Sequence, residues 1–423
     1  MTNYLNGKLF LEDVSFDSIA EKHGTPCYVY SQEHIIKEFN DYQAAFVNYP
    51  NTTICFSVKA NSNLSVLNIF KNLGSGFDIV SGGELERVVK LGANPKRIVF
   101  SGVAKSEEEI NKAIEYDILF FNVESFDELE QINRLASKAK KKAGISIRVN
   151  PDIDPKTHPY ISTGLSTSKF GIPIKESLNV YLEASKMKDV EILGIDSHIG
   201  SQIIDLDPFE DSMERLVDLY SQLKEKNINI QYIDIGGGLG IKYEDESTPP
   251  FKKNFAEKII SHIKKTGCNL ILEPGRSLVG NSGYLLTKIL YKKKNQKKNF
   301  LIVDAGMNDL LRPALYGSYH KIDPILDPAY SKEVEETFDI VGPICETGDV
   351  LGGNVTIPNP KLGDVLVINS AGAYGSVMGS NYNTRPKIPE ILIHNDKDSV
   401  IRKRETISQI LDNEVVVDLW AIH

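Results

Sequence analysis

Residues 53–101 read TICFSVKANSNLSVLNIFKNLGSGFDIVSGGELERVVKLGANPKRIVFS, and this stretch decides the fold. Short apolar or β-branched runs alternate in it with longer stretches of helical spacing, such as 83–92. The alternation continues along the chain, with further helical patterns at 106–116 and 125–142. The strand-like runs lie at 53–58, 77–80, 97–101, 118–122, 145–149, 193–198, 231–235 and 270–273. Eight strands alternating with helices predict a (β/α)8 barrel of the TIM type, with a doubly wound open sheet as the alternative.

After Arg276 the pattern changes. Strand-like runs now follow one another with Gly, Pro and Asn between them, at 285–294, 299–306, 336–353 and 363–374. This succession predicts a mostly antiparallel β domain, which the run CYVYS at 27–31 is expected to join. We therefore expect two domains: a barrel over residues 30–280, and a sandwich-like or barrel-like β domain over residues 1–29 and 281–423.

The composition argues against several kinds of partner. Lys and Arg total 48 against 57 Asp and Glu, a net charge of −9, whereas nucleic-acid binders need a basic surface. No run approaches the roughly 18 apolar residues of a membrane helix, and no secretory signal is visible. Cysteines without CxxC spacing indicate reduced thiols rather than disulfides or a metal site; they are Cys27, Cys55, Cys268 and Cys345. We expect a cytoplasmic protein with no nucleic-acid, membrane or metal partner.

The carboxyl ends of the predicted barrel strands carry the candidate site residues, because barrel enzymes place their catalytic groups there. A lysine, a histidine, two arginines, two carboxylates and several glycines converge on this rim. They are Lys59, Asp78, Arg148, His198, Gly236, Gly237, Gly238, Glu273, Gly275 and Arg276. The convergence is more informative than any one residue.

Four of these features together indicate pyridoxal phosphate. Lys59 follows an apolar run, so desolvation is expected to lower its pKa and suit it to Schiff-base formation; a lysine reaching into solvent is the alternative. The glycine run 236–240 could wrap a phosphate or form only a tight turn. Glu273 could face a pyridine nitrogen, and His198 could stack on a flat ring or act as an acid or base. Ion pairing and core packing are the alternatives for these two residues.

The C-terminal half adds candidates for substrate contact. Arg276 and Arg312 could clamp a carboxylate by bidentate hydrogen bonds, or form ordinary ion pairs. Cys345 could donate a proton, although an isolated cysteine is more often a small buried residue. Tyr316 accompanies Arg312, and Tyr374 lies among small residues that give its ring no evident packing role.

Longer motifs resemble those of the fold-type III pyridoxal-phosphate decarboxylases, and within them the diaminopimelate branch. The resemblance covers residues 24–410 and rests on FSVKAN (56–61), GSGFDIVSGGEL (74–85), SHIGSQI (197–203), DIGGGLGIKY (234–243), EPGRSLV (273–279), GPICETGD (342–349) and GAYGSVMGSNYNTRP (372–386). The segments RVNPDIDPKTHPYISTGLSTSKFGI (148–172) and DAGMNDLLRPALYGSYHKI (304–322) favour that branch over ornithine and arginine decarboxylases.

The resemblance implies a role for each candidate. Lys59 would carry the cofactor, His198 would lie against its ring, and Glu273 would pair with its pyridine nitrogen. The residues around the phosphate would be Ser201, Gly236, Gly237, Gly238, Gly275, Arg276 and Tyr374, with Asp78 and Arg148 in support. The substrate's distal carboxylate would be held by Arg276, Arg312 and Tyr316, with Tyr374 nearby. Glu346 would bind the distal ammonium, and Cys345 would return a proton after CO2 leaves.

The implied protein has an alanine-racemase-like barrel with a β domain and decarboxylates meso-2,6-diaminopimelate to L-lysine, the last step of lysine biosynthesis. It would be a homodimer, because in this family Cys345 and Glu346 come from the neighbouring subunit. The alternatives are a decarboxylase of a related diamino acid or carboxylated polyamine or siderophore precursor, a racemase, and a non-enzymatic regulator. Gly317 and Ser318 stand where the family carries a larger residue and alanine, a departure expected to change only local pocket shape.

Overall fold

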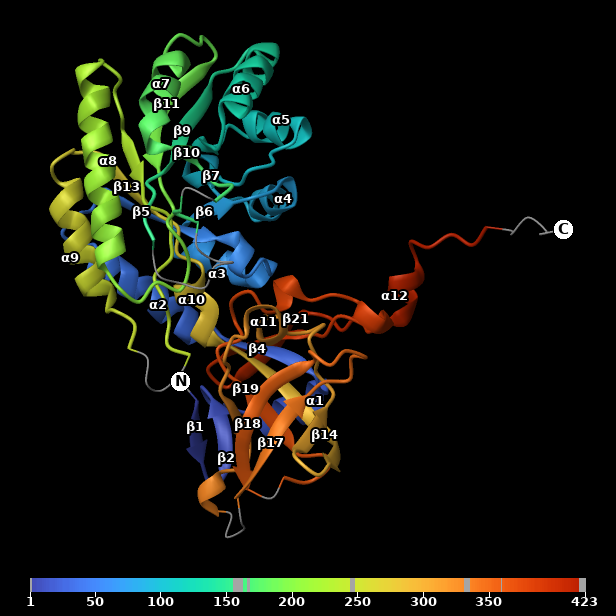
Figure 1. Ribbon diagram of the computed structural model, residues 1–423. Coiled ribbons are helices and arrows are strands. Elements are labelled where there is room, and N and C mark those ends of the chain that lie inside the picture. Colours follow the sequence, from blue (N-terminus) through green and yellow to red (C-terminus); the bar gives the residue numbers. More distant parts are fainter. Residues whose placement is uncertain are drawn as a thin grey trace. The chain divides into compact units, whose positions relative to one another are not determined.

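The computed structural model describes residues 2–154, 163–165, 168–243, 248–330, 335–358 and 360–417. Parts of the family-like segment 148–172, at 155–162 and 166–167, therefore lie outside the described residues. The chain forms two compact units (Figure 1). The barrel unit comprises Gln32–Ser282 and Gly372–Val377, and the sheet unit comprises Met1–Ser31, Gly283–Ala371 and Met378–His423.

The barrel unit contains a closed ring of eight parallel strands. They are β5 (Thr52–Ser57), β6 (Gly76–Ile79), β7 (Ile98–Phe100), β8 (Phe120–Val123), β9 (Ala143–Asn150), β11 (Val190–Asp196), β12 (Tyr232–Asp234) and β13 (Asn269–Leu272). Each pairs with the next, and β13 pairs with β5, so the sheet closes on itself; the short β10 (Ile172–Pro173) adds to β9. The predicted barrel is confirmed, and the open-sheet alternative is wrong because an open sheet would leave β5 and β13 as unpaired edges.

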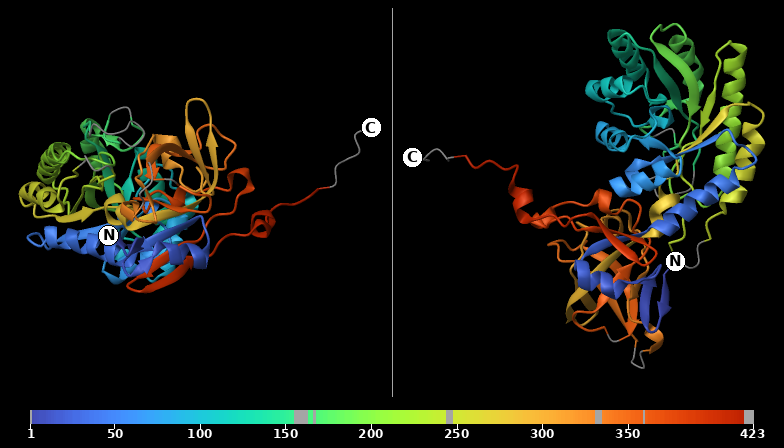
Figure 2. Two further views of the ribbon diagram at one scale, coloured as in Figure 1. Left: turned by 90° about the horizontal axis from the view of Figure 1, so that it is seen from below. Right: turned by 180° about the vertical axis from the view of Figure 1, so that it is seen from behind.

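Helices cover the outside of this ring (Figures 1 and 2). They are α2 (Gln32–Ala45), α3 (Leu64–Asn72), α4 (Gly82–Lys90), α5 (Glu107–Glu115), α6 (Phe126–Ala139), α7 (Ile174–Ala184), α8 (Asp207–Glu225), α9 (Lys252–Ile263) and the short α10 (Arg276–Val279). The sequence patterns at 83–92, 106–116 and 125–142 correspond to α4, α5 and α6. Each of these three begins after a serine whose hydroxyl accepts a backbone N–H of the first turn, as N-cap residues do.

The barrel interior has an apolar layer below a polar one. The apolar layer includes Cys55, Val99, Phe120 and Ile271. Side chains two positions further along a strand face the same way. At those positions the buried side chains are polar: Ser57, Ser101, Asn122 and Glu273. The apolar layer holds the barrel together, and the polar layer lies toward the carboxyl ends of the strands.

The sheet unit is mostly antiparallel, as predicted. Its main sheet has the order β18-β17-β15-β14-β4-β20-β21, and β19 pairs with both β14 and β16. The strands are β4 (Cys27–Ser31), β14 (Gly283–Lys294), β15 (Asn299–Val303), β16 (Ile322–Pro324), β17 (Glu335–Val341), β18 (Val350–Pro358), β19 (Val365–Ile368), β20 (Glu390–His394) and β21 (Lys397–Arg402). Only the β15–β17 and β4–β20 pairs are parallel among these described strands.

Smaller elements complete the sheet unit. A three-stranded sheet of β1 (Asn3–Leu5), β2 (Lys8–Leu11) and β3 (Val14–Ser15) precedes α1 (Phe16–His23), and α11 (Arg312–Tyr316) and α12 (Ile407–Leu411) follow later. The core joins chain segments that are far apart in sequence, with Leu11 and Phe16 packed in one cluster with Val29, Leu286 and Ile391. Among the described residues, no helix has the length and apolar character needed to span a bilayer.

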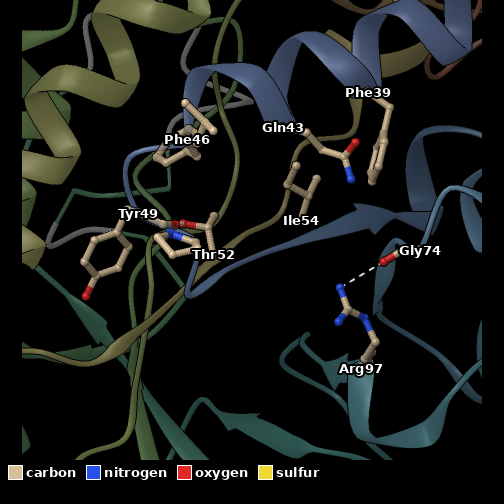
Figure 3. A pocket seen from close by; sticks show the side chains of 10 residues that line it. Phe39, Gln43, Phe46, Tyr49, Thr52, Ile54, Gly74 and Arg97 are labelled. Carbon is tan, nitrogen blue, oxygen red and sulfur yellow. Dashed lines mark hydrogen bonds between the residues drawn. The ribbon is translucent and has the colours of Figure 1, made fainter.

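Figure 3 shows a cavity of about 240 Å³ in the barrel unit. Its lining includes Thr52, where β5 begins, and Arg97, which precedes β7 and donates a hydrogen bond to the Gly74 carbonyl oxygen at 2.9 Å. The cavity therefore lies at the amino ends of the strands. None of the site residues expected from the sequence lines it, so the candidate site has to be sought at the opposite ends of the strands.

Candidate active site

Lys59 and Asp78 form an ion pair at the rim of the barrel. Lys59 lies in the 3-10 turn η1 (Val58–Ala60) directly after β5, and its Nζ donates to Asp78 Oδ2 at 2.6 Å. Asp78, on β6, is fully buried, and the Lys59 side chain is 34% exposed. The pair joins the ends of two strands that are hydrogen-bonded to each other, so two residues that are 19 positions apart in the sequence come into direct contact.

The expectation of a lowered pKa at Lys59 is wrong. Burial does lower it, but the negative charges of Asp78 and Glu273 and the Tyr374 hydroxyl outweigh burial and raise the pKa of Lys59 above its ordinary value. A charged ammonium beside carboxylates gains more Coulomb energy than it loses by desolvation. Lys59 is thus held as a cation by its neighbours in this state of the protein.

Glu273 lies directly after β13 and is buried. Its Oε1 accepts hydrogen bonds from Asn122 Nδ2 at 3.3 Å and from Ser101 Oγ at 3.4 Å. Burial raises the pKa of Glu273 well above its ordinary value, and nearby carboxylates, led by Asp234, raise it further. A carboxyl group with a raised pKa binds a proton strongly and can share it in a hydrogen bond with a neighbouring acceptor.

His198 follows β11 and is held as a neutral ring. Its Nδ1 accepts the backbone N–H of Gly237 at 3.1 Å, which leaves the ring proton on Nε2. Burial and then the charges of Arg148 and Lys59 lower the pKa of His198 well below its ordinary value. An uncharged imidazole suits a ring-facing role better than an acid role at neutral pH.

Arg148, on β9, is anchored from three sides. Its Nη1 donates to Glu124 Oε1 at 2.7 Å, its Nε lies 3.8 Å from Asp196 Oδ2, and its guanidinium lies 4.8 Å from the centre of the Phe170 ring. All three contacts lie within the barrel unit and restrain the guanidinium. Arg148 is therefore a positive charge held in place by the protein's own side chains.

The glycine run packs tightly against the other site residues. Gly236 has a φ of 65°, and a Cβ there would lie 2.5 Å from His198 Nδ1. A Cβ on Gly237 would lie 2.2 Å from the Glu273 carbonyl oxygen. Only glycine allows the backbone this close an approach, so the run brings its N–H groups to the strand ends that carry His198 and Glu273.

Arg276 is the centre of a second polar group in the barrel unit. It follows Gly275 at the start of α10, and its guanidinium donates to Tyr243 Oη at 2.7 Å and to Ser201 Oγ at 3.1 Å. The same guanidinium lies 4.9 Å from the centre of the Tyr374 ring. Tyr374 in turn donates its backbone N–H to the Ala60 carbonyl oxygen at 2.9 Å, next to Lys59.

Arg312 and Tyr316 begin and end α11 in the sheet unit. Arg312 is buried, with its Nη1 2.9 Å from His320 Nε2 and its Nη2 donating to Ser318 Oγ at 3.2 Å. The departure at Gly317-Ser318 is therefore not confined to pocket shape, because the Ser318 hydroxyl contacts a proposed site residue. Gly317 has a φ of 60°, which suits its place just after the helix.

Cys345 and Glu346 share an exposed loop of the sheet unit. The Cys345 N–H donates to Asn383 Oδ1 at 3.0 Å, and Glu346 accepts a hydrogen bond from the Tyr382 hydroxyl. The Asp349 carboxylate holds the base of this loop by accepting the Ile344 N–H at 2.7 Å. Cys345 is exposed, so the alternative of a small buried residue is excluded.

The structure thus brings together one part of the predicted set. The barrel unit contains Lys59, Asp78, Arg148, His198, Ser201, Gly236, Gly237, Gly238, Glu273, Gly275, Arg276 and Tyr374, and the sheet unit contains Arg312, Tyr316, Cys345 and Glu346. Sequence reasoning missed the polar residues among them, namely Ser57, Ser101, Asn122, Asp196, Asp234 and Tyr243. For all of these except Tyr243, the signal was a polar residue at an inward position in or directly after an otherwise apolar strand, which the period of two could have revealed. Tyr243 lies outside the strands and carried no such signal.

Comparison with known proteins decides the family. The profile of the pyridoxal-dependent decarboxylase family, pyridoxal binding domain, matches residues 32–280. Diaminopimelate decarboxylase of Aquifex aeolicus is 48% identical over 97% of this chain and 96% of its own length. The chain belongs to the diaminopimelate decarboxylase family.

Other diaminopimelate decarboxylases are similarly close. The Pseudomonas aeruginosa protein is 46% identical over 97% of this chain and 98% of its own length. The crystal structure of diaminopimelate decarboxylase from Helicobacter pylori complexed with L-lysine matches with a TM-score of 0.89 at 43% identity, covering 94% of this chain and 98% of that chain. The likeness extends over both units, so the sheet unit is as much a part of the family fold as the barrel.

Proposed function

We propose that this protein decarboxylates meso-2,6-diaminopimelate to L-lysine and CO2, the last step of lysine biosynthesis. It is a pyridoxal-phosphate-dependent carboxy-lyase. The observation that carries the proposal is the set of Lys59, Asp78 and Glu273 at adjoining strand ends, in a chain that belongs to the diaminopimelate decarboxylase family. The related decarboxylases of other diamino acids are not favoured by this family membership.

The polar layer of the barrel fits pyridoxal phosphate. Among the described residues, Asp78 Oδ1 and Asn122 Oδ1 are buried oxygens with no hydrogen-bond partner, so this layer retains capacity for a polar group. Lys59 supplies an amine for the aldehyde, Glu273 a basic carboxylate for the pyridine nitrogen, and neutral His198 a flat face. The phosphate would be held by Ser201, Gly236, Gly237, Gly238, Gly275, Arg276 and Tyr374.

When bound, the cofactor takes up the electrons that remain on the α-carbon after CO2 leaves. The protein's own residues support this chemistry. Asp78 keeps Lys59 in place, and Glu273 holds a proton at the pyridine nitrogen because its own carboxyl is so basic. Cys345, exposed on its loop, is the proposed donor of the proton to the α-carbon.

Substrate selection is assigned to charged side chains. Arg276, Arg312 and Tyr316, with Tyr374 nearby, hold the distal carboxylate, and Glu346 holds the distal ammonium. A clamp built for a charged group rejects analogues that lack it, because the clamp would then be left unpaired. L-Lysine and L-ornithine, which lack the second carboxylate, are therefore expected to be poor substrates.

We further propose a cytoplasmic homodimer with shared active sites. The exposed Cys345–Glu346 loop supports it, because a loop that serves a neighbouring subunit has to reach the surface. Arg312, proposed to hold the distal carboxylate of the substrate, belongs to the sheet unit together with this loop. Lys59 belongs to the barrel unit, so the proposed active site needs residues of both units.

An assay with purified protein tests the function. With pyridoxal phosphate and meso-diaminopimelate, we expect equal amounts of L-lysine and CO2, preceded by the visible absorbance of lysine-bound cofactor. Lys59→Ala is expected to lose the absorbance and at least about 1,000-fold in kcat, since covalent attachment is lost; Lys90→Ala, an exposed lysine on α4, should change neither.

Each other outcome points elsewhere. Absorbance without lysine formation would contradict the substrate and direct the search to other amino acids. Turnover without CO2 release would indicate a racemase. A wild-type protein that never acquires the absorbance would remove the enzyme proposal and leave a non-enzymatic regulator.

A further inference from the structure

Three carboxyl groups meet at the ends of neighbouring barrel strands. Asp196 ends β11, Asp234 ends β12, and Glu273 directly follows β13. One carboxylate oxygen of each residue lies within 4.8 Å of one oxygen of each of the other two, and each residue is at most 5% exposed. The proposed function uses only Glu273, so the two aspartates have no role in it.

The two oxygens of the Asp234 carboxyl group differ in their hydrogen bonding. Its Oδ1 accepts the Gly236 N–H at 2.9 Å. Its Oδ2 is buried and, within the part of the chain that the structure describes, makes no hydrogen bond to an N–H or hydroxyl donor. The carboxyl group of Glu273 belongs to the same cluster, with an oxygen within 4.8 Å of an Asp234 oxygen. Two carboxyl groups can form a hydrogen bond with each other only when one of them carries a proton.

The surrounding charges favour a proton on this pair. Burial raises the pKa of Glu273, and the charges of Asp234, Asp78 and Asp196 raise it further, while Lys59 opposes them. Burial also raises the pKa of Asp234, and the charge of Asp78 raises it further, while the Gly236 N–H, the Glu273 carboxyl and the Asn122 amide lower it.

Two further neighbours act on these carboxyl groups. The guanidinium of Arg148 lies 3.8 Å from Asp196 Oδ2, and it also interacts electrostatically with Glu273. Asn122, on β8, donates its amide to Glu273 Oε1 at 3.3 Å and so helps to hold the group in place. Two carboxyl groups this close in a buried site cannot both ionise without a large cost.

We propose that Asp234 and Glu273 share a single proton, and that Asp234 is thereby the positioning residue that orients Glu273 toward the pyridine nitrogen. The proton's bond to one carboxyl oxygen forms as its bond to the other breaks, so no further reactant is needed. The shared proton restrains rotation of the Glu273 carboxyl, whose Oε1 accepts hydrogen bonds from Asn122 and Ser101. The orienting role rests on the proposed cofactor chemistry, whereas the shared proton does not.

Asp234→Asn tests the shared proton because asparagine keeps an oxygen for the Gly236 N–H but cannot accept the proton. The readout is infrared titration of protonated carboxyl groups in the full-length protein without added cofactor, with Glu273→Gln used to assign the Glu273 band. We expect the titration midpoint of Glu273 to fall by about one pH unit or more in Asp234→Asn, which is about tenfold in proton affinity. Asp304→Asn, at a buried aspartate of the sheet unit bonded to Thr287, should leave that midpoint unchanged.

A second measurement separates orientation from structural support. In the enzyme loaded with pyridoxal phosphate, Asp234→Asn is expected to lower kcat about tenfold or more, leave KM for diaminopimelate unchanged, and shift the pH profile of the cofactor absorbance. If Asp234 only supported the structure, asparagine at this position would preserve both kcat and the pH profile of the cofactor absorbance. An unchanged Glu273 midpoint would overturn the shared proton, and an unchanged absorbance profile would overturn the orienting role. If the Glu273 midpoint shifts in Asp234→Asn but the wild-type enzyme does not decarboxylate diaminopimelate, the shared proton is supported and only the proposed function is contradicted.

Discussion

At the scale of single residues, the neutral state of His198 predicts how stability depends on pH. Its pKa is lowered by burial and by Arg148 and Lys59, whereas in the unfolded chain it is about 6.5. Below about pH 6.5 the unfolded chain therefore binds a proton that the folded protein does not. The free energy of unfolding should fall with decreasing pH, by up to about 1.4 kcal/mol per pH unit from this group. Urea denaturation between about pH 5.5 and 7.5 measures how the free energy of unfolding depends on pH. This dependence should be weaker in His198→Gln than in the wild type, and the same as the wild type in His394→Gln, at an exposed site. The same dependence in all three proteins would contradict the assignment.

At the scale of elements, one side chain ties the turn after β11 to the end of the glycine run. Gln202 donates to the Ile241 carbonyl oxygen at 2.7 Å and accepts the Ile241 N–H at 3.1 Å. Gln202→Ala leaves both backbone groups without these bonds, which should cost about 1–3 kcal/mol of stability. Because the loosened run includes the proposed phosphate ligands, the affinity for pyridoxal phosphate should fall about tenfold, measured by fluorescence titration. Gln296→Ala, at an exposed turn, is the control; unchanged cofactor affinity in Gln202→Ala would show that the run does not need this clamp.

At the scale of the whole molecule, the separation of Lys59 from Cys345 into different units bears on assembly. If Cys345 serves the active site of a neighbouring subunit, a dimer that combines Lys59→Ala and Cys345→Ala chains contains one intact site. Each variant alone should be nearly inactive, and random re-association of an equal mixture should restore about a quarter of wild-type activity. The measurement is decarboxylase activity after denaturation and joint refolding. Activity no higher than that of the separate variants would contradict shared sites, and wild type treated in parallel controls for refolding.

The sequence predicted most of the fold because strand and helix periodicities are local. Every strand-like run from 53–58 to 270–273 corresponds to a barrel strand. The positions of Lys59, His198 and Glu273 at the strand ends were also predictable, since each lies at the end of an apolar run. Asp196 and Asp234 were missed because they lie inside the runs LGIDSH and QYIDI, where the apolar residues dominate the pattern.

By itself, the sequence determined the alternation of strands and helices, the change to a β domain, and the motifs of the decarboxylase family. These are properties of neighbouring residues, which periodicity and spacing express directly. Only the tertiary structure decided that Lys59 stays charged beside Asp78, that Ser318 contacts Arg312, and that Asp234 and Glu273 belong to one buried cluster of carboxyl groups. Such effects depend on distances between residues far apart in the chain, and the Coulomb energy of a buried pair changes steeply with those distances and with burial.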